Sequence, residues 1–225
     1  MRCWPRVDSK GAKYTTTVLD RCWLSKITYE LLLSKPASFD FSPGQRIQLI
    51  YGTTARDYSL VSSPSDSKIV VCIRLVPEGL LSPELSNLPS NTDLQFTGPH
   101  GYFTFKPSSR PTIFVATGTG VAPFCSMVRS GIGGYTLLHG VQTAEELYYG
   151  EEFGSTAALY VPCLSESDLS SEAYFQGRVS DYLLNRLPPD TYDFYLCGHA
   201  EMIRDVTFLV DDKFPGSFIY TESFY

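Results

Sequence analysis

The sequence predicts two domains: an antiparallel six-stranded β-barrel over residues 1–106, followed by a doubly wound α/β domain with a parallel sheet over residues 111–225. Three observations predict this fold class. The first half contains short apolar stretches separated by turn residues, which is typical of antiparallel strands. The second half alternates buried strands with helical patterns, which favours a parallel sheet covered on both faces. The polar segment Lys106–Arg110 between them contains Pro107, and we interpret it as a linker.

Length and composition are those of an ordinary globular chain. The 225 residues are 43% hydrophobic and 19% charged, which is enough to bury a core in each of two domains. The net charge is -6 and no run of Lys and Arg occurs, so we expect no surface for nucleic acid or anionic membranes. No apolar stretch has the length of a transmembrane segment, and Met1–Lys10 lacks the apolar core of a signal peptide.

The cysteines and histidines do not follow a metal-binding pattern. No two of them have the close spacing that zinc or iron–sulfur sites require. We expect the cysteines to be reduced and mostly buried thiols, as in a cytoplasmic protein. The cysteines are Cys3, Cys22, Cys72, Cys125, Cys163 and Cys197, and the histidines are His100, His139 and His199.

Six strands are expected in the first half, because Thr, Val, Leu and Tyr are concentrated there between turns. Pro43 and Gly44 form a turn before the third strand, and Gly52 turns the chain into the fourth. The expected strands are Lys13–Leu19, Ile27–Leu33, Arg46–Tyr51, Arg56–Val61, Ile69–Leu75 and Asp93–Thr97.

One short helix interrupts these strands. Residues Pro83–Leu88 are predicted to be helical, with Ser82 as the N-cap, because a serine hydroxyl can accept a backbone N–H there. The helix is preceded by Gly79-Leu80-Leu81-Ser82. A helix start preceded by glycine exposes free backbone N–H groups and suits a pyrophosphate, and the alternative is a capped surface helix without a ligand.

Strands and helices are expected to alternate beyond Arg110. The expected strands are Thr112–Ala116, Tyr135–His139, Ala158–Cys163, Phe194–Cys197 and Phe218–Tyr220. The expected helices are Val121–Arg129, Thr143–Tyr149, Val179–Leu187 and His199–Val210.

A cation, a ring and a hydroxyl occur together in the fourth strand, in Arg56-Asp57-Tyr58-Ser59. Side chains alternate along a strand, so Arg56 and Tyr58 are expected on the same side. They suit a ligand whose phosphate pairs with Arg56 and whose ring stacks on Tyr58, close to the Ser59 hydroxyl. The alternative is an ordinary amphipathic edge strand.

A second motif, Gly118-Thr119-Gly120, lies between a predicted strand and a predicted helix. This arrangement places the pyrophosphate of a dinucleotide on a helix N-terminus. The third glycine of the usual fingerprint is missing, and Pro123 lies in the first helical turn, where proline is tolerated. The alternative is a glycine-rich turn without a ligand.

In combination these motifs resemble the ferredoxin–NADP reductase family, whose members have a β-barrel flavin domain and a nucleotide domain. The resemblance covers nearly the whole chain and follows the order of the family's motifs. It rests on Arg56-Asp57-Tyr58-Ser59, Gly79-Leu80-Leu81-Ser82, Gly118-Thr119-Gly120-Val121-Ala122-Pro123, and Cys197-Gly198 with Met202.

The resemblance implies a flavin site in the first domain. Arg56 would pair with the flavin phosphate, Tyr58 would stack on the isoalloxazine, and Ser59 would lie near flavin N5. Residues Gly79 to Ser82 would hold the second phosphate, assisted by Arg74, which implies FAD rather than FMN.

The resemblance also implies a nicotinamide site in the second domain. Gly118 to Pro123, with Thr119, Gly120 and Val121 between them, would cradle the dinucleotide. Cys197 would lie against the nicotinamide ring, and Gly198 would also belong to the cofactor-binding residues. Cys197 follows a predicted strand, so we expect it at the mouth of the sheet, where ligands bind. The alternative for Cys197 is a small buried residue at a strand end.

The last residues match another feature of the family. Members often end with a carboxylate and, two residues later, an aromatic residue that covers the flavin. Glu222 and Phe224 have this spacing, and Tyr225 leaves open which of the two rings stacks. The alternative is a frayed aromatic tail.

One departure from the family concerns the second nucleotide. Members that use NADP place cationic and hydroxyl groups after the second and third strands of the nucleotide domain. Here Gln142 stands where an arginine is common, and Glu166 and Asp168 follow the third strand. Each carboxylate would repel a 2′-phosphate by about 1 kcal/mol in a wet site. We therefore expect NADH to be preferred over NADPH.

These expectations describe an FAD-dependent oxidoreductase that passes a hydride from NADH (or NADPH) to FAD. Electrons would then go to a separate acceptor, such as a ferredoxin, an oxygenase component or a small molecule. Ser59, Cys197 and Glu222 are the candidate catalytic residues. The alternatives are a free flavin or quinone reductase, a non-catalytic FAD-binding subunit of a larger redox complex, and a protein of this fold without flavin. The sequence does not predict an oligomeric state.

Overall fold

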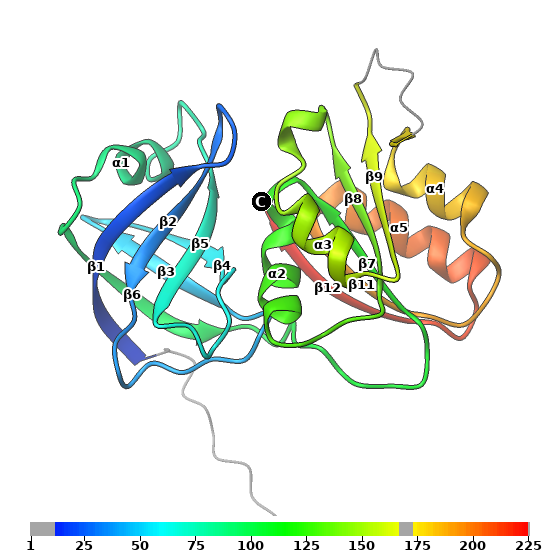
Figure 1. Ribbon diagram of the computed structural model, residues 1–225, viewed down its shortest axis with the longest axis horizontal. Coiled ribbons are helices and arrows are strands. Elements are labelled where there is room, and N and C mark those ends of the chain that lie inside the picture. Colours follow the sequence, from blue (N-terminus) through cyan, green and yellow to red (C-terminus); the bar gives the residue numbers. More distant parts are fainter. Residues whose placement is uncertain (1–11, 167–172, 225) are drawn as a thin grey trace, which may run out of the picture.

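The computed structural model describes residues 12–166 and 173–224, which form two six-stranded sheets side by side (Figure 1). The first sheet is antiparallel, with the order β4-β3-β6-β1-β2-β5, and the second is parallel, with the order β10-β9-β8-β7-β11-β12. The predicted fold class is therefore confirmed. The first sheet contains β1 (Ala12–Trp23), β2 (Thr28–Ser34), β3 (Arg46–Tyr51), β4 (Thr54–Ser59), β5 (Lys68–Arg74) and β6 (Asp93–His100).

The antiparallel sheet curls into a barrel because its two edges meet. Leu60, directly after β4, forms a β-bridge with Val71 of β5. The next residue, Val61, donates its backbone N–H to the carbonyl of Val70 at 2.9 Å. Apolar side chains fill the interior, each no more than 1% exposed; they include Leu31, Leu33, Ile47, Leu49, Ile69 and Phe96.

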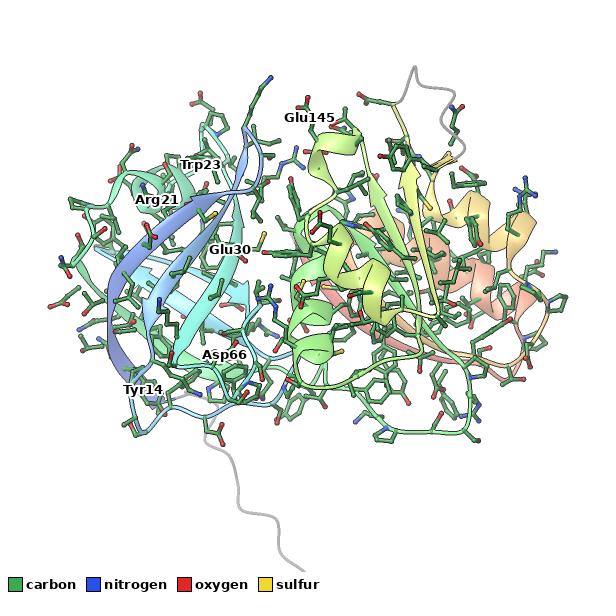
Figure 2. The ribbon with its side chains drawn as sticks, in the orientation of Figure 1. Tyr14, Arg21, Trp23, Glu30, Asp66 and Glu145 are labelled. Carbon is green, nitrogen blue, oxygen red and sulfur yellow. The ribbon has the colours of Figure 1, made fainter. Side chains whose placement is uncertain are left out.

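Helix α1 (Ser82–Asn87) begins differently from the prediction. Leu81 is the N-cap, and no side chain caps the helix. Ser82 is the first helical residue, and its hydroxyl accepts the backbone N–H of Val76 at 3.0 Å. The predicted N-cap is wrong because this hydroxyl closes the preceding loop instead. At the other end of the helix, Arg21 of β1 donates to two backbone carbonyl oxygens (Figure 2).

The parallel sheet has helices on both faces, α2 and α3 on one and α4 and α5 on the other (Figure 1). Helix α2 lies next to the barrel, and its Phe124 and Met127 share one buried cluster with Val61 and Cys72 of the barrel. The elements are β7 (Thr112–Thr117), a 3-10 turn (Gly118–Val121), α2 (Ala122–Arg129), β8 (Thr136–Val141), a second 3-10 turn (Ala144–Glu146), α3 (Gly150–Thr156), β9 (Leu159–Leu164), β10 (Phe175–Gln176), α4 (Val179–Arg186), β11 (Asp193–His199), α5 (Ala200–Lys213) and β12 (Phe218–Phe224).

The predicted helix Thr143–Tyr149 is not formed. Only Ala144–Glu146 makes a 3-10 turn, and α3 begins after Tyr149, which has a left-handed φ of 60°. The Tyr149 hydroxyl donates a 2.9 Å hydrogen bond to the carboxylate of Glu30 in the barrel. A contact with the other sheet therefore overrides the local preference for helix, which explains the wrong prediction.

Side-chain hydrogen bonds fix the two sheets against each other. The Tyr148 hydroxyl donates to Thr28 Oγ1 at 2.7 Å, next to the Tyr149–Glu30 contact. On α2, the buried Ser126 hydroxyl donates to the carbonyl of Ser62 at 2.7 Å. These bonds tie α2 and the start of α3 to the barrel at two places.

The described part of the chain contains five of the six cysteines and the helices α1 to α5. Its five cysteines are unpaired, and four of them are buried, whereas Cys22 is exposed. Cys3 lies outside the described residues. Within residues 12–166 and 173–224, no helix combines the length and apolarity needed to cross a bilayer. The same residues contain no cluster of three or more His, Cys, Asp or Glu side chains placed to hold a metal ion.

Candidate functional site

Two adjoining cavities lie where the sheets meet. The larger, of about 960 Å³, is lined by β4, the loop before α1 and the end of β12. The smaller, of about 420 Å³, lies at the C-terminal edge of the parallel sheet. Arg74, Thr119 and Phe224 line both cavities. Molecules bound in the two cavities can therefore approach each other at these three residues.

The cation and the ring of the fourth strand both line the larger cavity, and so do their neighbours Ala55, Asp57 and Ser59. Arg56 is exposed, and its guanidinium donates only to the carbonyl of Ala55, at 2.7 Å, among the described residues. Tyr58 is half-buried against the barrel core. Burial raises the pKa of Tyr58 to about 12, so the phenol is neutral at physiological pH and offers an uncharged ring to the cavity.

Ser59 contributes a buried hydroxyl that has no partner in the described structure. The residue is 3% exposed, and its Oγ makes no hydrogen bond with any described group. A buried polar group without a partner costs about 1–3 kcal/mol. Because Ser59 also lines the larger cavity, a ligand with a hydrogen-bonding atom there would remove this cost.

The loop before α1 and Arg74 line another part of the larger cavity. Gly79 closes a tight turn, in which its N–H donates to the Val76 carbonyl at 2.8 Å. A Cβ at Gly79 would lie 3.0 Å from that carbonyl oxygen, so a larger residue would crowd the turn. Leu81 is buried and anchors the loop, whereas Leu80 is 70% exposed. The N–H of Gly79 is thus used within the loop, and a phosphate would have to bind the following residues or Arg74.

The glycine motif after β7 lies at the smaller cavity, which Gly118 and Thr119 line. Gly118 has a left-handed φ of 51°, a conformation that favours glycine. Gly120 is needed for a close approach, because a Cβ there would lie 2.3 Å from the carbonyl oxygen of Cys197. Val121 and Pro123 are buried in the start of the helical segment and line neither cavity.

Cys197 does not lie at the mouth of the sheet, and this expectation is corrected. Strand β11 continues past it, its side chain is 0% exposed, and it lines neither cavity. Burial, followed by the neighbouring Glu222 charge, raises the pKa of its thiol well above the ordinary value. The next residue, Gly198, does line the smaller cavity, and a Cβ there would lie 2.2 Å from Thr117 Oγ1.

The end of β12 reaches the larger cavity through Glu222 and Phe224. Glu222 Oε1 lies 2.6 Å from a guanidinium nitrogen of Arg46 in β3, and Arg46 also contacts Asp57 Oδ2 at 2.9 Å. Sequence reasoning missed Arg46, because its partner is 176 residues away and no local pattern connects them. Tyr225, the other candidate for covering the flavin, lies outside the described residues.

The smaller cavity contains charges that the sequence did not single out. Gln142 lines it as expected, but Glu166 is exposed and does not line it, and Asp168 lies outside the described residues. Glu146 lines the cavity instead; it is 8% exposed and accepts the N–H of Gln142 at 3.4 Å. The cations at this cavity are Arg74 and Arg178, and two further carboxylates, Glu201 and Asp205, also line it.

Comparison with known proteins identifies both halves of the chain. Residues 22–105 match the model of an oxidoreductase FAD-binding domain, and residues 114–207 match that of an oxidoreductase NAD-binding domain. A solved ferredoxin NADP+ reductase from Neisseria gonorrhoeae, with bound FAD and NADP, superposes with a TM-score of 0.81. It is 22% identical, and the match covers 95% of this chain and 99% of that one, which shows a shared fold.

Two curated relatives are more similar in sequence. The electron transfer component of 2-halobenzoate 1,2-dioxygenase from Burkholderia cepacia is 31% identical over 92% of this chain and 66% of its own length. Ferredoxin–NADP reductase B from Sorangium cellulosum (strain So ce56) is 34% identical over 74% of this chain and 77% of its own length. The chain spans about half to two thirds of the length of several other curated relatives. The chain belongs to the ferredoxin–NADP reductase family of oxidoreductases, with an FAD-binding domain followed by an NAD-binding domain.

Proposed function

We propose that this chain is an FAD-dependent oxidoreductase, in which a hydride passes from a nicotinamide nucleotide to FAD and electrons then pass to a separate acceptor. One observation carries the proposal: the two cavities adjoin at Arg74, Thr119 and Phe224. A hydride transfer needs two rings in contact, and adjoining cavities at the boundary between the two domains support such an arrangement. We propose that residues 1–106 form the FAD-binding domain and residues 111–225 the nucleotide-binding domain.

The groups that line the larger cavity support FAD as its ligand. Arg56 would pair with one phosphate, Tyr58 would stack on the isoalloxazine, and Arg74 with residues 80–82 would hold the second phosphate. The unpartnered Ser59 hydroxyl would hydrogen-bond the ring near N5. When bound, FAD supplies the hydride acceptor and the ability to release electrons singly, while the protein binds, orients and excludes water.

The smaller cavity would hold the nicotinamide nucleotide. Gly118 and Thr119 would bind its pyrophosphate, and Gly198 would leave space for the ring at the end of β11. Cys197 would act through its backbone, which packs against Gly120, because its thiol is buried. Phe224 lines both cavities, so we assign it as the residue that covers the flavin ring.

We further propose that NADH is the preferred nucleotide. Gln142 provides no positive charge, and the nearly buried carboxylate of Glu146 lies at the same cavity. Arg178 is the residue that could oppose this preference, because it also lines that cavity. The ratio of kcat/KM for NADH and NADPH measures the preference, and a clear advantage for NADPH would overturn it.

The acceptor is proposed to be a separate protein, such as a ferredoxin or an oxygenase component, or a small molecule. Several relatives are named as electron transfer components of dioxygenases, which supports a protein acceptor. A cytoplasmic location is proposed because the described cysteines are unpaired thiols, as expected in a reducing compartment.

The test is an absorbance spectrum of the purified protein, recorded with FAD before and after NADH is added without oxygen. A flavin spectrum that NADH bleaches supports the proposed function. A yellow protein that neither NADH nor NADPH bleaches would favour a non-catalytic FAD-binding subunit. Bleaching followed by rapid turnover with free flavins or quinones, and none with acceptor proteins, would favour a free reductase.

A further inference from the structure

An ion pair joins the two domains at the wall of the larger cavity. Glu222 lies on β12 in the parallel sheet, and Arg46 lies on β3 in the barrel. Glu222 Oε1 and a guanidinium nitrogen of Arg46 are 2.6 Å apart, and both residues line the cavity. Their side chains are 14% and 29% exposed, so the pair is partly desolvated, and water screens its Coulomb attraction less than that of a fully exposed ion pair.

The guanidinium of Arg46 is held in place by the barrel. Asp57 contacts it at 2.9 Å, and Gln48 in turn donates to Asp57 at 2.9 Å. Gly101 leaves the space that the guanidinium fills, because a Cβ there would lie 2.7 Å from an Arg46 nitrogen. Gln45 donates to the Gly101 carbonyl at 3.0 Å and fixes that turn. Arg46 is therefore preorganised before it meets Glu222.

The ion pair is close to the proposed reaction centre. Arg46 stands directly opposite Ser59 in the β3–β4 ladder, and residues directly opposite in an antiparallel pair share one face. Phe224 lies two residues after Glu222 on β12 and lines both cavities. The pair thus ties the strand end that carries Phe224 to the strand beside the unpartnered Ser59 hydroxyl.

We propose that Arg46 is a positioning residue of the flavin pocket: it holds the Glu222 carboxylate, offsets its negative charge beside the reacting ring, and ties the end of β12 to the barrel. This inference rests on the proposed flavin function. Transfer of a hydride would bring negative charge to bound FAD, and an unpaired carboxylate nearby would oppose that charge. With Arg46 in place, the Glu222 carboxylate can remain ionised without repelling the negative charge on the flavin.

The charged and titratable groups that face Glu222 determine its pKa, so the role proposed for Arg46 can be tested by the pH dependence of flavin reduction. They are Arg46 of β3, Asp57 of β4 and Cys197 of β11. Burial raises the pKa of Glu222, and Arg46 is the group that counteracts it. Loss of Arg46 therefore raises the pKa of Glu222 further. The carboxyl is neutral below that pKa and an uncompensated anion above it, so flavin reduction slows as the pH rises through it.

The experiment uses R46Q, R46K, E222Q and the double variant R46Q/E222Q, with R129Q as the matched control. Arg129 pairs with Glu152 at 2.9 Å with similar side-chain exposure, 27% and 30%, and lines neither cavity. The first readout is unfolding of the flavin-free protein by denaturant. We expect the Arg46–Glu222 cycle to show a coupling of at least about twofold in the unfolding equilibrium constant.

The second readout is the rate of FAD reduction by NADH in single turnovers across a pH series. R46Q should gain one ionisation step, across which the rate falls from the value with neutral Glu222 to a lower plateau with the ionised carboxylate. R46K, R46Q/E222Q and R129Q should lack this step, although R129Q should lose stability. Flavin affinity, measured by fluorescence quenching, should fall less than the rate in R46Q at high pH.

Absence of coupling in the flavin-free protein, or an R46Q profile identical to that of R129Q, would overturn the inference while wild-type reduction by NADH stands. A wild-type protein whose flavin no nicotinamide nucleotide reduces would instead overturn the proposed function. A step that persists in R46Q/E222Q would assign the ionisation to another group and would also overturn the role of Arg46.

Discussion

Gly120 lies directly against the backbone of Cys197, so that the glycine loop after β7 and the end of β11 form one packed unit. A Cβ at Gly120 would lie 2.3 Å from the Cys197 carbonyl oxygen and 2.7 Å from the Gly198 Cα. Both contacts are with backbone, which cannot rotate away as a side chain can. The nucleotide loop and the residues beside the proposed nicotinamide site are therefore positioned by each other.

Gly120→Ala should weaken binding of the nicotinamide nucleotide by tenfold or more, because the loop must shift away from β11. Binding of FAD should change less, since Gly120 lines neither cavity and the glycine loop contributes Gly118 and Thr119 to the smaller cavity but only Thr119 to the larger one. Titration with NADH and with FAD separates the two effects. Gly154→Ala is the control, because that exposed helical glycine has no atom within 4 Å of an added Cβ. Equal NADH affinity in the two variants would contradict the packing argument.

Ser59→Ala should leave the stability of the flavin-free protein unchanged or slightly raised, since Ser59 Oγ has no partner to lose. Reduction of bound FAD by NADH should nevertheless slow, and stopped-flow absorbance measures it. Ser126→Ala should show the opposite pattern, with a loss of about 1 kcal/mol in unfolding free energy, because its hydroxyl donates to Ser62. An unaltered reduction rate in Ser59→Ala would remove this serine from the mechanism.

Tyr149→Phe should lower the free energy of unfolding by about 1.5–3 kcal/mol, because the hydroxyl donates to the carboxylate of Glu30 across the domain boundary. The ring remains, so its packing is retained, and only the hydrogen bonds of the hydroxyl, to Glu30 and to the Cys72 thiol, are lost. Denaturant unfolding of the flavin-free protein measures the change. Tyr102→Phe serves as the control, because Tyr102 is 89% exposed. A loss of the same size in the control would show that the boundary contact is not responsible.

His139 should make the protein less stable in mild acid. The residue is 0% exposed, accepts or donates a 3.2 Å hydrogen bond with Tyr160, and faces the Gly118 backbone. Burial lowers its pKa to about 4, whereas an unfolded histidine has a pKa of about 6.5. The unfolded state therefore binds more protons between these values, and stability is fully present above pH 6.5 and falls as the pH drops toward 4.

The expected loss from this histidine is about 2 kcal/mol at pH 5 and about 3 kcal/mol near pH 4. Denaturant unfolding at pH 7.5, 6 and 5 measures it, and His139→Gln should show a shallower decline than the wild type. His100→Gln, at a half-buried histidine of the barrel, should follow the wild-type decline. Parallel curves for the wild type and His139→Gln would contradict the prediction.

Much of the architecture could be predicted from local sequence. Alternating apolar residues specified the strands around Ile47 and Leu49, and Gly44 and Gly52 marked the turns between them. The glycine pair after β7 and the cation and ring of β4 located parts of both cavities, because each motif lies within a few residues of chain. The helix Thr143–Tyr149 and the Ser82 N-cap were wrong, because in both cases a tertiary or loop contact was stronger than the local preference.

By itself, the sequence determined the two-domain fold and the order of the motifs, since these follow from periodicity and from residues that are neighbours in the chain. The cofactor classes were implied by the resemblance of those ordered motifs to the ferredoxin–NADP reductase family. Only the tertiary structure decided that the Cys197 thiol is buried, that Glu146 lies at the nucleotide cavity, and that Arg46 holds Glu222. Burial and long-range pairing depend on how distant segments pack together. A strand of six residues shows alternating apolar and polar residues in the sequence. The Arg46–Glu222 pair is separated by 176 residues, and no local sequence pattern indicates it.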